Sequence, residues 1–263
     1  MMGLKDRHKE HINILDYLKG LKTEPLQPNP IEEIKRTLNN GEIINEREAL
    51  LAHMEKHLFP IEYSCAPLKN EEITGAVFSF KNITERKRSE REIQNLAFYD
   101  QLTKLPNRTL FYDRIKQRVA QAERDQQKLG VMFFDLDDFK VVNDTLGHDA
   151  GDEFLRVIAR RLKDSSRQAD TIARLGGDEF VWFGEIIDKD DAELIAKKFL
   201  ENVAQPVNLE GQNLISTVSI GISLFPDSAK DVVGLMKCAD TAMYSAKQKS
   251  KNAFHFYRKP RGS

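Results

Sequence analysis

The sequence predicts an α+β protein with two domains, of which the second contains a βαββαβ sheet of the ferredoxin-like type. Three observations support this fold class. The chain has 263 residues, of which 40% are hydrophobic, and this is enough to bury two cores. From about residue 100 onward, segments typical of strands and of helices alternate. The alternation is broken at Gly176-Gly177, where two strand-like segments meet directly in a hairpin.

The N-terminal region predicts a smaller α/β domain. A short helix is expected at 31–41, where an amphipathic segment is closed by an Asn-Gly pair. Three strand-like segments follow at 42–52, 59–68 and 74–83. Their alternation of apolar and polar residues predicts a half-buried antiparallel sheet.

Residues 84–98 connect the two domains. They are dense in charge and have only sparse apolar positions, which predicts an exposed signalling helix or a short coiled coil. The alternative is a solvated linker helix that has no partner.

The second domain is predicted to contain four helices and five strands, with the helices on one face of the sheet. The helices are expected at 110–124, 152–166, 191–204 and 231–249, and the strands at 131–136, 171–175, 179–186, 215–225 and 253–257.

Composition excludes several classes of partner. The formal net charge is -1, so no overall field attracts nucleic acid or an anionic membrane. No apolar run approaches the roughly 20 residues that span a bilayer. Cys65 and Cys238 lie far apart, which predicts two buried thiols in a reducing compartment and no disulfide. We therefore expect a cytoplasmic protein, with no membrane and no nucleic-acid partner for this chain.

Two groups of acidic residues predict a metal site. Gly176 and Gly177 can take positive φ and close a two-residue turn, which places Asp178 and Glu179 at the tip of a hairpin. Asp135 ends a strand that is expected to lie beside this hairpin in the centre of the sheet. Carboxylates gathered without basic neighbours favour a divalent cation, and hard oxygen ligands favour Mg²⁺. A polar hairpin tip without a ligand is the alternative for the turn taken alone.

Four motifs occur in order along the second domain: LTKLPNR, FDLDDFKVVNDTLGHDAGDEFL with RLGGDEF, TVSIGIS, and YSAKQKSKN. Together they resemble the GGDEF family of diguanylate cyclases over about residues 97–257. The resemblance implies a nucleotide-cyclase-like fold and a domain at 99–260.

The resemblance also implies the catalytic and metal-binding residues. Asp135 and Glu179 are the expected ligands of Mg²⁺ or Mn²⁺, with the main-chain carbonyl of Leu136 as a third ligand. Asp178 completes the acidic turn and is expected to help bind the metal or to take part in proton transfer.

The substrate implied by the resemblance is GTP. Asn143 and Asp152 match the residues that read guanine, since a carboxylate can accept from N1–H and the exocyclic amine. Their alternatives are local roles, with Asp152 as a helix cap and Asn143 as a turn residue.

Cationic residues for the phosphates are expected at three positions. Lys140 and Lys247 match phosphate-contacting lysines of the family. Lys251 stands where the family usually has arginine, so it keeps the charge but loses the bidentate fork. His148 is expected to organise its loop or to lie near the ribose.

The implied reaction joins two GTP molecules into cyclic di-GMP, with release of pyrophosphate, by a homodimer. A catalytically silent module that binds cyclic di-GMP or GTP is the alternative from a different functional class. Residues 26–48 and 59–90 resemble parts of a PAS sensor domain, so we expect a partial PAS-like domain at 1–83 that regulates the enzyme through the helix at 84–98.

Arg167 and Asp170 form an R-x-x-D pair at the spacing of the family's inhibitory product site. Arg167 can bind a phosphate and stack on guanine, and Asp170 can accept from a guanine edge. Lys197 or Lys198 is expected to supply a second cation. The alternative is a surface pair in which Arg167 and Asp170 cap each other.

Overall fold

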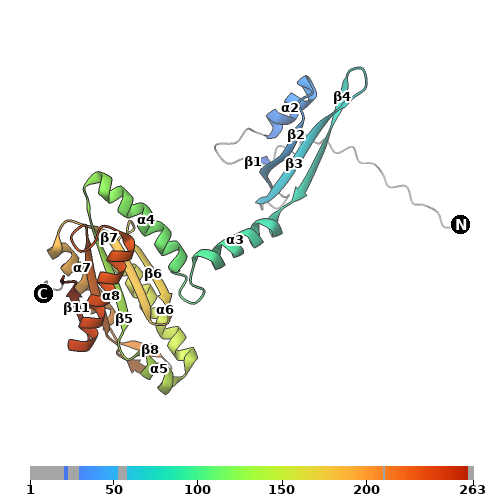
Figure 1. Cartoon of the computed structure of the whole chain (residues 1–263). Helices are drawn as coiled ribbons and strands as arrows, with labels where there is room; N and C mark the ends of the chain where they lie inside the picture. The colour runs from blue at the N-terminus through green and yellow to red at the C-terminus, as the bar shows by residue number, and fades with distance from the viewer. Residues whose placement is uncertain (1–20, 23–29, 53–57, 210, 260–263) are drawn as a thin grey trace. The chain divides into compact units, whose positions relative to one another are not determined.

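A computed structural model describes residues 21–22, 30–52, 58–209 and 211–259 of the chain (Figure 1). The chain divides into two compact units, Met1–Ile93 and Gln94–Ser263. No helix within these described residues is long and apolar enough to cross a membrane.

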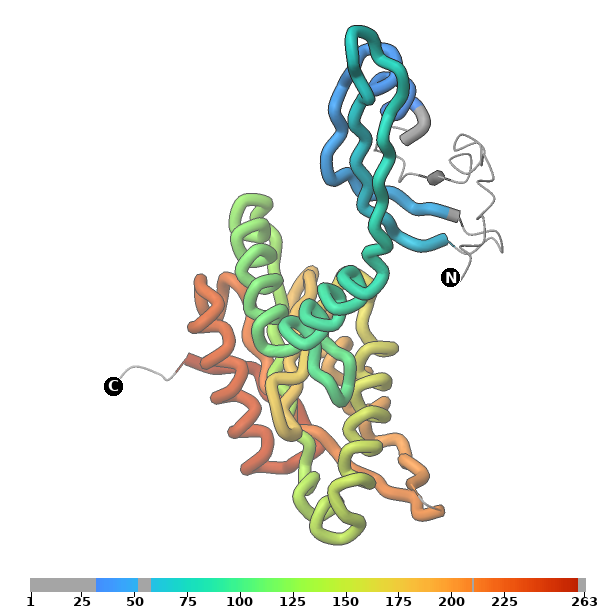
Figure 2. Tube along the Cα trace, turned by 90° about the vertical axis from the view of Figure 1, so that its right-hand side faces the viewer, coloured from blue at the N-terminus to red at the C-terminus, as the bar shows by residue number. Residues whose placement is uncertain are grey.

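The first unit contains an antiparallel sheet in the order β1-β2-β3-β4 and the helix α2 (Figure 2). Their bounds are Leu21–Lys22, Ile44–Ala52, Leu58–Lys69 and Ile73–Asn82 for the strands and Pro30–Asn40 for the helix. Ile34 of α2 packs in one buried cluster with Ile61 and Cys65 of β3. The structure confirms the predicted helix and the three predicted strands. It adds β1, and the PAS-like assignment stays a prediction.

Helix α3 spans Thr84–Phe98, as the sequence predicts. Its first main-chain N–H, on Thr84, donates to the Asn82 side chain at 2.9 Å. None of its residues is buried, and Ile93 and Leu96 are 65% and 62% exposed.

The second unit is built on a five-stranded sheet in the order β11-β10-β5-β7-β6. The strands are β5 (Lys128–Leu136), β6 (Thr171–Gly176), β7 (Glu179–Ile186), β10 (Val218–Phe225) and β11 (Ala253–Phe256), and the helices are α4 (Arg108–Asp125), α5 (Phe139–Leu146), α6 (His148–Ser165), α7 (Lys189–Val203) and α8 (Val232–Lys249). Neighbouring strands are antiparallel except β10 and β11, which are parallel. The order β10-β5-β7-β6 confirms the ferredoxin-like βαββαβ prediction.

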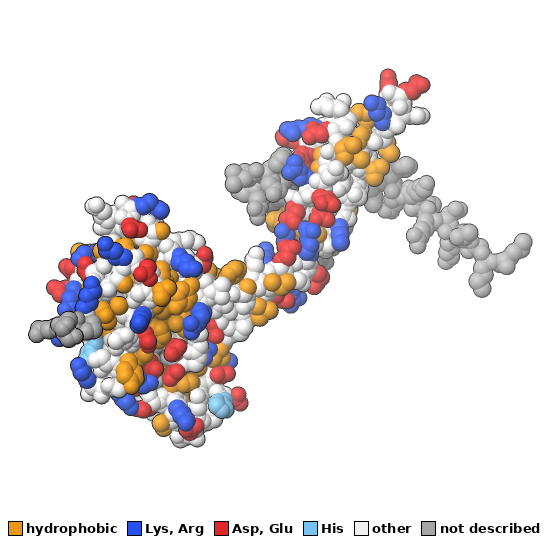
Figure 3. Space-filling view, viewed as in Figure 1, with side chains coloured by type: hydrophobic (Ala, Val, Ile, Leu, Met, Phe, Trp, Pro, Cys, Tyr) orange, Lys and Arg blue, Asp and Glu red, His pale blue; other side chains and the backbone are white. Residues whose placement is uncertain are grey.

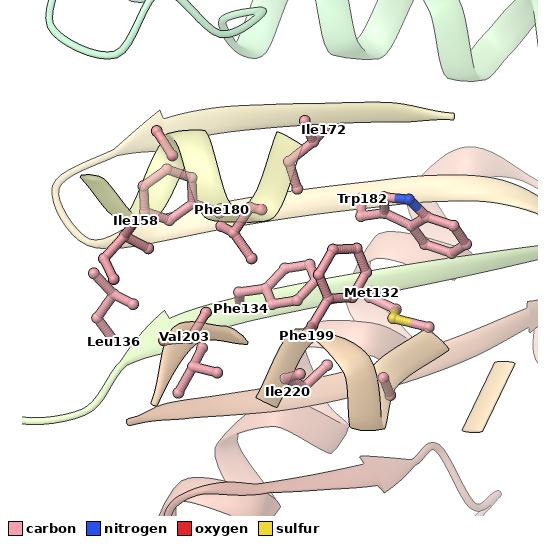
Figure 4. Close-up of a cluster of buried hydrophobic side chains, with 14 of the residues drawn as sticks. Met132, Phe134, Leu136, Ile158, Ile172, Phe180, Trp182, Phe199, Val203 and Ile220 are labelled. Atoms are coloured by element: carbon pink, nitrogen blue, oxygen red, sulfur yellow. The ribbon is translucent and has the colours of Figure 1, made fainter. Parts of the chain in front are cut away.

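Helices cover both faces of this sheet, so the prediction of one covered face was wrong. On β5, Met132 and Phe134 belong to a cluster with α6 and α7 (Figure 4), while Val131 and Phe133 belong to a cluster with α4 and α8. The whole apolar run of β5 is buried, and such a strand requires cover on both sides. The two helices inside the βαββαβ unit, α6 and α7, do lie on one face of the sheet, as predicted.

Two further elements were not predicted. One is α5, which follows β5 directly, and the other is the small hairpin of β8 (Val207–Leu209) and β9 (Gln212–Leu214). Both cysteines are free, but only Cys65 is buried, and Cys238 is half-buried.

Candidate active site

The acidic turn and the end of β5 meet in the centre of the sheet. In the antiparallel pairing of β5 and β7, Asp135 lies directly opposite Glu179. Gly176 pairs with Glu179 across the hairpin, so the two loop residues are Gly177 and Asp178. The predicted loop, Gly176-Gly177, is displaced by one residue because the register shifts between Arg174 and Gly176. Gly177, in the loop, has a positive φ of 53°, which favours glycine, and Gly176, the last residue of β6, has φ of 147°.

Asp135 and Glu179 are harder to ionise than free carboxyl groups. Burial raises the pKa of both Asp135 and Glu179 above the ordinary values, and the charge of Asp178 raises each of them further. Arg108, at the start of α4, opposes this shift at Glu179. A bound cation relieves such repulsion, so the electrostatics of the turn favour a metal ion.

Lys247 is a basic neighbour of the acidic turn, so the expectation of carboxylates without basic neighbours was wrong. Its ammonium Nζ lies 2.5 Å from Asp135 Oδ1. Burial lowers the pKa of Lys247, but the bond and charge of Asp135 outweigh it, and the net shift is upward. Lys247 thus stands at the acidic turn as a charged donor, while its predicted role in phosphate binding remains a prediction.

The donor set fits Mg²⁺ or Mn²⁺. In the described part of the chain, no three His, Cys, Asp or Glu side chains are grouped as a complete metal site. Asp135 and Glu179 nevertheless offer two carboxylates, and Mg²⁺ takes only one or two from a protein and keeps oxygen ligands from water or phosphate. Leu136 is buried beside them, and its N–H donates to the Asp178 carbonyl at 3.4 Å.

Asp137 holds the end of β5 in place. It is 3% exposed, and its carboxylate accepts hydrogen bonds from Thr217 Oγ1 at 2.6 Å, Ser219 Oγ at 2.7 Å and the main-chain N–H of Asn252 at 3.0 Å. Its own N–H donates to the Thr217 carbonyl at 2.8 Å. This N–H belongs to the same peptide unit as the Leu136 carbonyl, so Asp137 fixes the direction of a predicted metal ligand. Asp137 was not among the residues predicted from the sequence.

The three predicted phosphate-binding lysines differ in their contacts near the end of β5. Lys251 has φ of 40° and binds both oxygens of Asp138, at 2.7 and 2.8 Å. Lys140 is exposed on the first turn of α5, which begins directly after Asp138. Lys247 and Lys251 are thus bonded to Asp135 and Asp138 at the end of β5.

The predicted guanine-binding residues lie on neighbouring helices. Asn143 is on α5, and its side chain packs so closely against Gly151 of α6 that a Cβ at that position would overlap it. Asp152 follows directly and is exposed. Because α6 begins at His148, Asp152 lies inside the helix, and the alternative that it caps the helix is wrong. His148 is exposed at the first position of α6.

A model of the GGDEF domain family, described as diguanylate cyclase, GGDEF domain, matches residues 97–253. The chain belongs to the GGDEF family. The chain is 44% identical over 174 residues to the bifunctional diguanylate cyclase/cyclic di-GMP phosphodiesterase MucR of Pseudomonas aeruginosa. This match covers 66% of the chain but only 25% of MucR, so the chain spans a quarter of that relative's length.

Solved structures show the GGDEF fold in the second unit. The crystal structure of the GGDEF domain of TpbB from Pseudomonas aeruginosa matches with a TM-score of 0.59 and 36% identity, over 60% of this chain and 99% of that one. The coiled coil and GGDEF domain of DgcB from Caulobacter crescentus, in complex with c-di-GMP, matches with a TM-score of 0.59 and 26% identity, over 65% and 92%.

The GGDEF turn is braced by a residue that the sequence analysis missed. Arg174, in β6, donates from Nε and Nη2 to the Gly177 carbonyl at 2.9 and 2.7 Å. Its Nη1 donates to the Asp100 carboxylate at 3.1 Å. Arg174 stands three residues before Gly177, so the contact with the turn is local in the sequence. Asp100, the second partner of Arg174, is 74 positions away.

The predicted product site of the GGDEF domain lies at a pocket of about 440 Å³. Residues lining it include Arg167, Asp170, Asp191, Leu194, Lys197 and Lys198. The Asp170 carboxylate accepts the main-chain N–H of Arg167 at 2.9 Å, as the capping alternative requires. The Arg167 guanidinium, however, contacts Asp191 at 3.4 Å, and the Arg167 side chain is 61% exposed. Lys198 donates to the Ser165 carbonyl, and Lys197 pairs with Glu193.

Charge elsewhere on the chain is mixed. On the face drawn in Figure 3, basic and acidic side chains are interspersed, which accords with a net charge of -1.

Proposed function

We propose that this chain is a diguanylate cyclase that condenses two GTP molecules into cyclic di-GMP and releases two pyrophosphates. The observation that carries the proposal is the cross-strand pair of Asp135 and Glu179, with Asp178 at the tip of the turn beside them. Membership of the GGDEF family supports the same reaction.

The reaction is two successive phosphoryl transfers. In each, the 3′-oxygen of one GTP forms a bond to the α-phosphorus of the other, and the bond from that phosphorus to the bridging α–β oxygen breaks. Pyrophosphate leaves with the bond electrons, and the hydroxyl proton passes to a carboxylate of the turn or to water. Mg²⁺ or Mn²⁺, when held by Asp135, Glu179 and the Leu136 carbonyl, supplies positive charge that acidifies the hydroxyl and neutralises the phosphates.

The side chains around the turn bind and orient GTP. Asn143 and Asp152 read the guanine edge, and the closeness of Asn143 to the α6 turn that carries Asp152 supports a joint role. Lys140, Lys247 and Lys251 bind the phosphates at the end of β5. His148, at the first position of α6, organises the loop near the ribose.

The enzyme acts as a homodimer because each GGDEF domain, at 99–260, holds one GTP. Helix α3 joins the two copies, and its exposed Ile93 and Leu96, three positions apart on one face, support a coiled-coil seam. The N-terminal PAS-like domain at 1–83 regulates the pairing through this helix.

Cyclic di-GMP inhibits the enzyme at the pocket lined by Arg167 and Asp170. Arg167 is exposed enough to exchange Asp191 for a phosphate, and either Lys197 or Lys198 supplies the second cation from the pocket wall.

A silent GGDEF module that binds cyclic di-GMP or GTP is the second candidate. It is favoured by NbdA of Pseudomonas aeruginosa, which is 34% identical over 165 residues and is named only as a cyclic di-GMP phosphodiesterase. The purified chain, incubated with GTP and Mg²⁺ and followed by chromatography of the nucleotides, decides between the two. Cyclic di-GMP and pyrophosphate are expected, whereas nucleotide binding without product establishes the silent module.

A further inference from the structure

Trp182 is the only tryptophan of the chain and is fully buried on β7. Its ring packs against Phe199 of α7, with ring centroids 6.0 Å apart (Figure 4). Gly130 and Gly184 face each other across β5 and β7 beneath the ring. A Cβ on Gly184 would lie 2.5 Å from the ring atom Cζ2, and one on Gly130 would lie 3.2 Å from Cζ3. The indole therefore packs directly against the backbone of the two glycines.

Asp170 flanks the same glycine. A Cβ on Gly184 would also lie 2.5 Å from Asp170 Oδ1, so this oxygen stands at the edge of the indole. The other oxygen, Oδ2, accepts the main-chain N–H of Arg167 at 2.9 Å. One oxygen of Asp170 is thus held by the backbone, and the other faces Trp182.

The indole N–H of Trp182 is a buried donor with no acceptor in hydrogen-bond geometry among the described residues. It is nevertheless close to the Asp170 carboxyl group. Burial raises the pKa of Asp170, and the nearby indole N–H of Trp182 offsets part of this increase. A buried donor without a partner is costly, so a small movement of the carboxylate that completes this bond is favourable. Asp170 also lines the pocket of about 440 Å³, and its movement therefore changes the pocket wall.

We propose that Trp182 is the positioning residue for Asp170, a proposal that rests on the product site proposed above. When a guanine edge donates to Asp170, the indole N–H completes a bond to Oδ1 and holds the carboxylate toward the pocket. Each carboxylate oxygen accepts more than one hydrogen bond, so Oδ1 and Oδ2 retain capacity for the ligand. Trp182 does not itself line the pocket and acts through Asp170.

The test is calorimetric titration of the full chain with cyclic di-GMP. Trp182→Phe keeps an aromatic ring at this position but replaces the indole by a smaller phenyl group without the N–H, and we expect Kd to rise about tenfold or more, as for the loss of a hydrogen bond to a charged group. Ile186→Val is the matched control. Ile186 also packs against Gly130, since a Cβ on Gly130 would lie 3.2 Å from Ile186 Cγ2, but Ile186 does not flank Gly184. We expect Ile186→Val to bind as the wild type does.

A second variant keeps the indole and moves the carboxylate. Gly184→Ala places a methyl group between Asp170 and Trp182, and we expect a similar rise in Kd, measured by calorimetry and by the emission of the single tryptophan. If the wild type binds cyclic di-GMP and both variants bind it equally tightly, Trp182 has no positioning role, while the product site stands. If the wild type does not bind cyclic di-GMP, the product site and the role of Trp182 both fall.

Discussion

Arg174 binds the Asp100 carboxylate and the Gly177 carbonyl at the same time. The turn that carries Asp178 and Glu179 is therefore tied to the segment that precedes α4. The Arg174 side chain is 11% exposed, and its planar guanidinium supplies donors in both directions, which a lysine does not do. The position of the acidic turn depends on this arginine as well as on the glycines.

Asp100→Asn should weaken the folded state at neutral pH. Burial raises the pKa of Asp100, but hydrogen bonds from Thr103 and the charge of Arg174 outweigh it and hold the pKa below its ordinary value. A carboxyl with a lowered pKa stabilises the fold above its unfolded pKa of about 4 and loses this effect as the pH falls through the folded value. We expect a loss of about 1 kcal/mol at pH 7 in urea unfolding, which shrinks in acid.

Asp113→Asn is the control for that experiment, since Asp113 is an exposed acid of α4 whose carboxylate accepts from Gln117 at 3.0 Å. A loss of stability at Asp100 that stays constant from pH 7 into acid would contradict the assigned ion pair.

Asp135→Asn should abolish turnover without unfolding the domain. The substitution removes the charge of a proposed metal ligand, and it also relieves part of the repulsion at the turn. Added Mg²⁺ should raise the Tm of the wild type, because an ion that binds only the folded state stabilises it, and should leave Asp135→Asn unchanged. Glu185→Gln, on β7 but 52% exposed and paired with Arg118, is the control. An Asp135→Asn enzyme that still makes cyclic di-GMP at the wild-type rate would overturn the metal assignment.

The sequence predicted the meeting of Asp135 and Glu179 because strand order alone brings them together. In a βαββαβ sheet the first and third strands are central neighbours, and the antiparallel direction places the end of one beside the start of the other. The one-residue error in the loop arose from a local bulge before Gly176, which no periodic pattern records.

Other parts of the site depend on contacts between distant residues. The pairing of Lys251 with Asp138 and of Asn252 with Asp137 joins positions more than 100 residues apart. Both Lys251 and Asn252 have left-handed φ, which is uncommon outside glycine and is imposed here by the tertiary structure. Hydrophobic periodicity carries no information on such pairs, and it also does not say which helices cover the second face of a sheet.

Asp152→Ser should relax the choice of base. The serine keeps a small polar group on α6 but removes the paired acceptor for guanine N1–H and the exocyclic amine, and each donor left unpaired costs roughly 1–3 kcal/mol. We expect slower use of GTP and weaker discrimination against ATP in direct competition. Asp149→Ser, which removes another exposed carboxylate of the same helix, should behave as the wild type. Unchanged competition between GTP and ATP would remove Asp152 from the base site.

Activity should depend on α3 as a dimer seam. Replacing Ile93 and Leu96 together by aspartate puts like charges on the proposed seam, and it should not disturb the core because both side chains are largely exposed. We expect a low rate per molecule at low protein concentration and partial recovery at high concentration, since the GGDEF domains must then meet by diffusion. Gln94→Asp, on the same helix, is the control. If the double variant has the same rate per molecule as the wild type at every protein concentration, α3 is not the dimer seam.

Arg167→Ala should relieve inhibition by the product. Arg167 is bound to Asp191 at 3.4 Å but remains 61% exposed, so a phosphate of cyclic di-GMP replaces one carboxylate contact by a bidentate one. Wild-type progress curves should slow as cyclic di-GMP accumulates, while those of Arg167→Ala should stay closer to linear, with a Kd for the product raised at least tenfold, about 1.4 kcal/mol. Lys163→Ala, which removes an exposed charge near the end of α6, controls for the general loss of a cation. Progress curves that slow identically in wild type and Arg167→Ala, with equal affinity for cyclic di-GMP, would contradict the product site. Arg167 and Asp170 would then be a surface pair that caps the local backbone, because the main-chain bond between them does not involve the guanidinium.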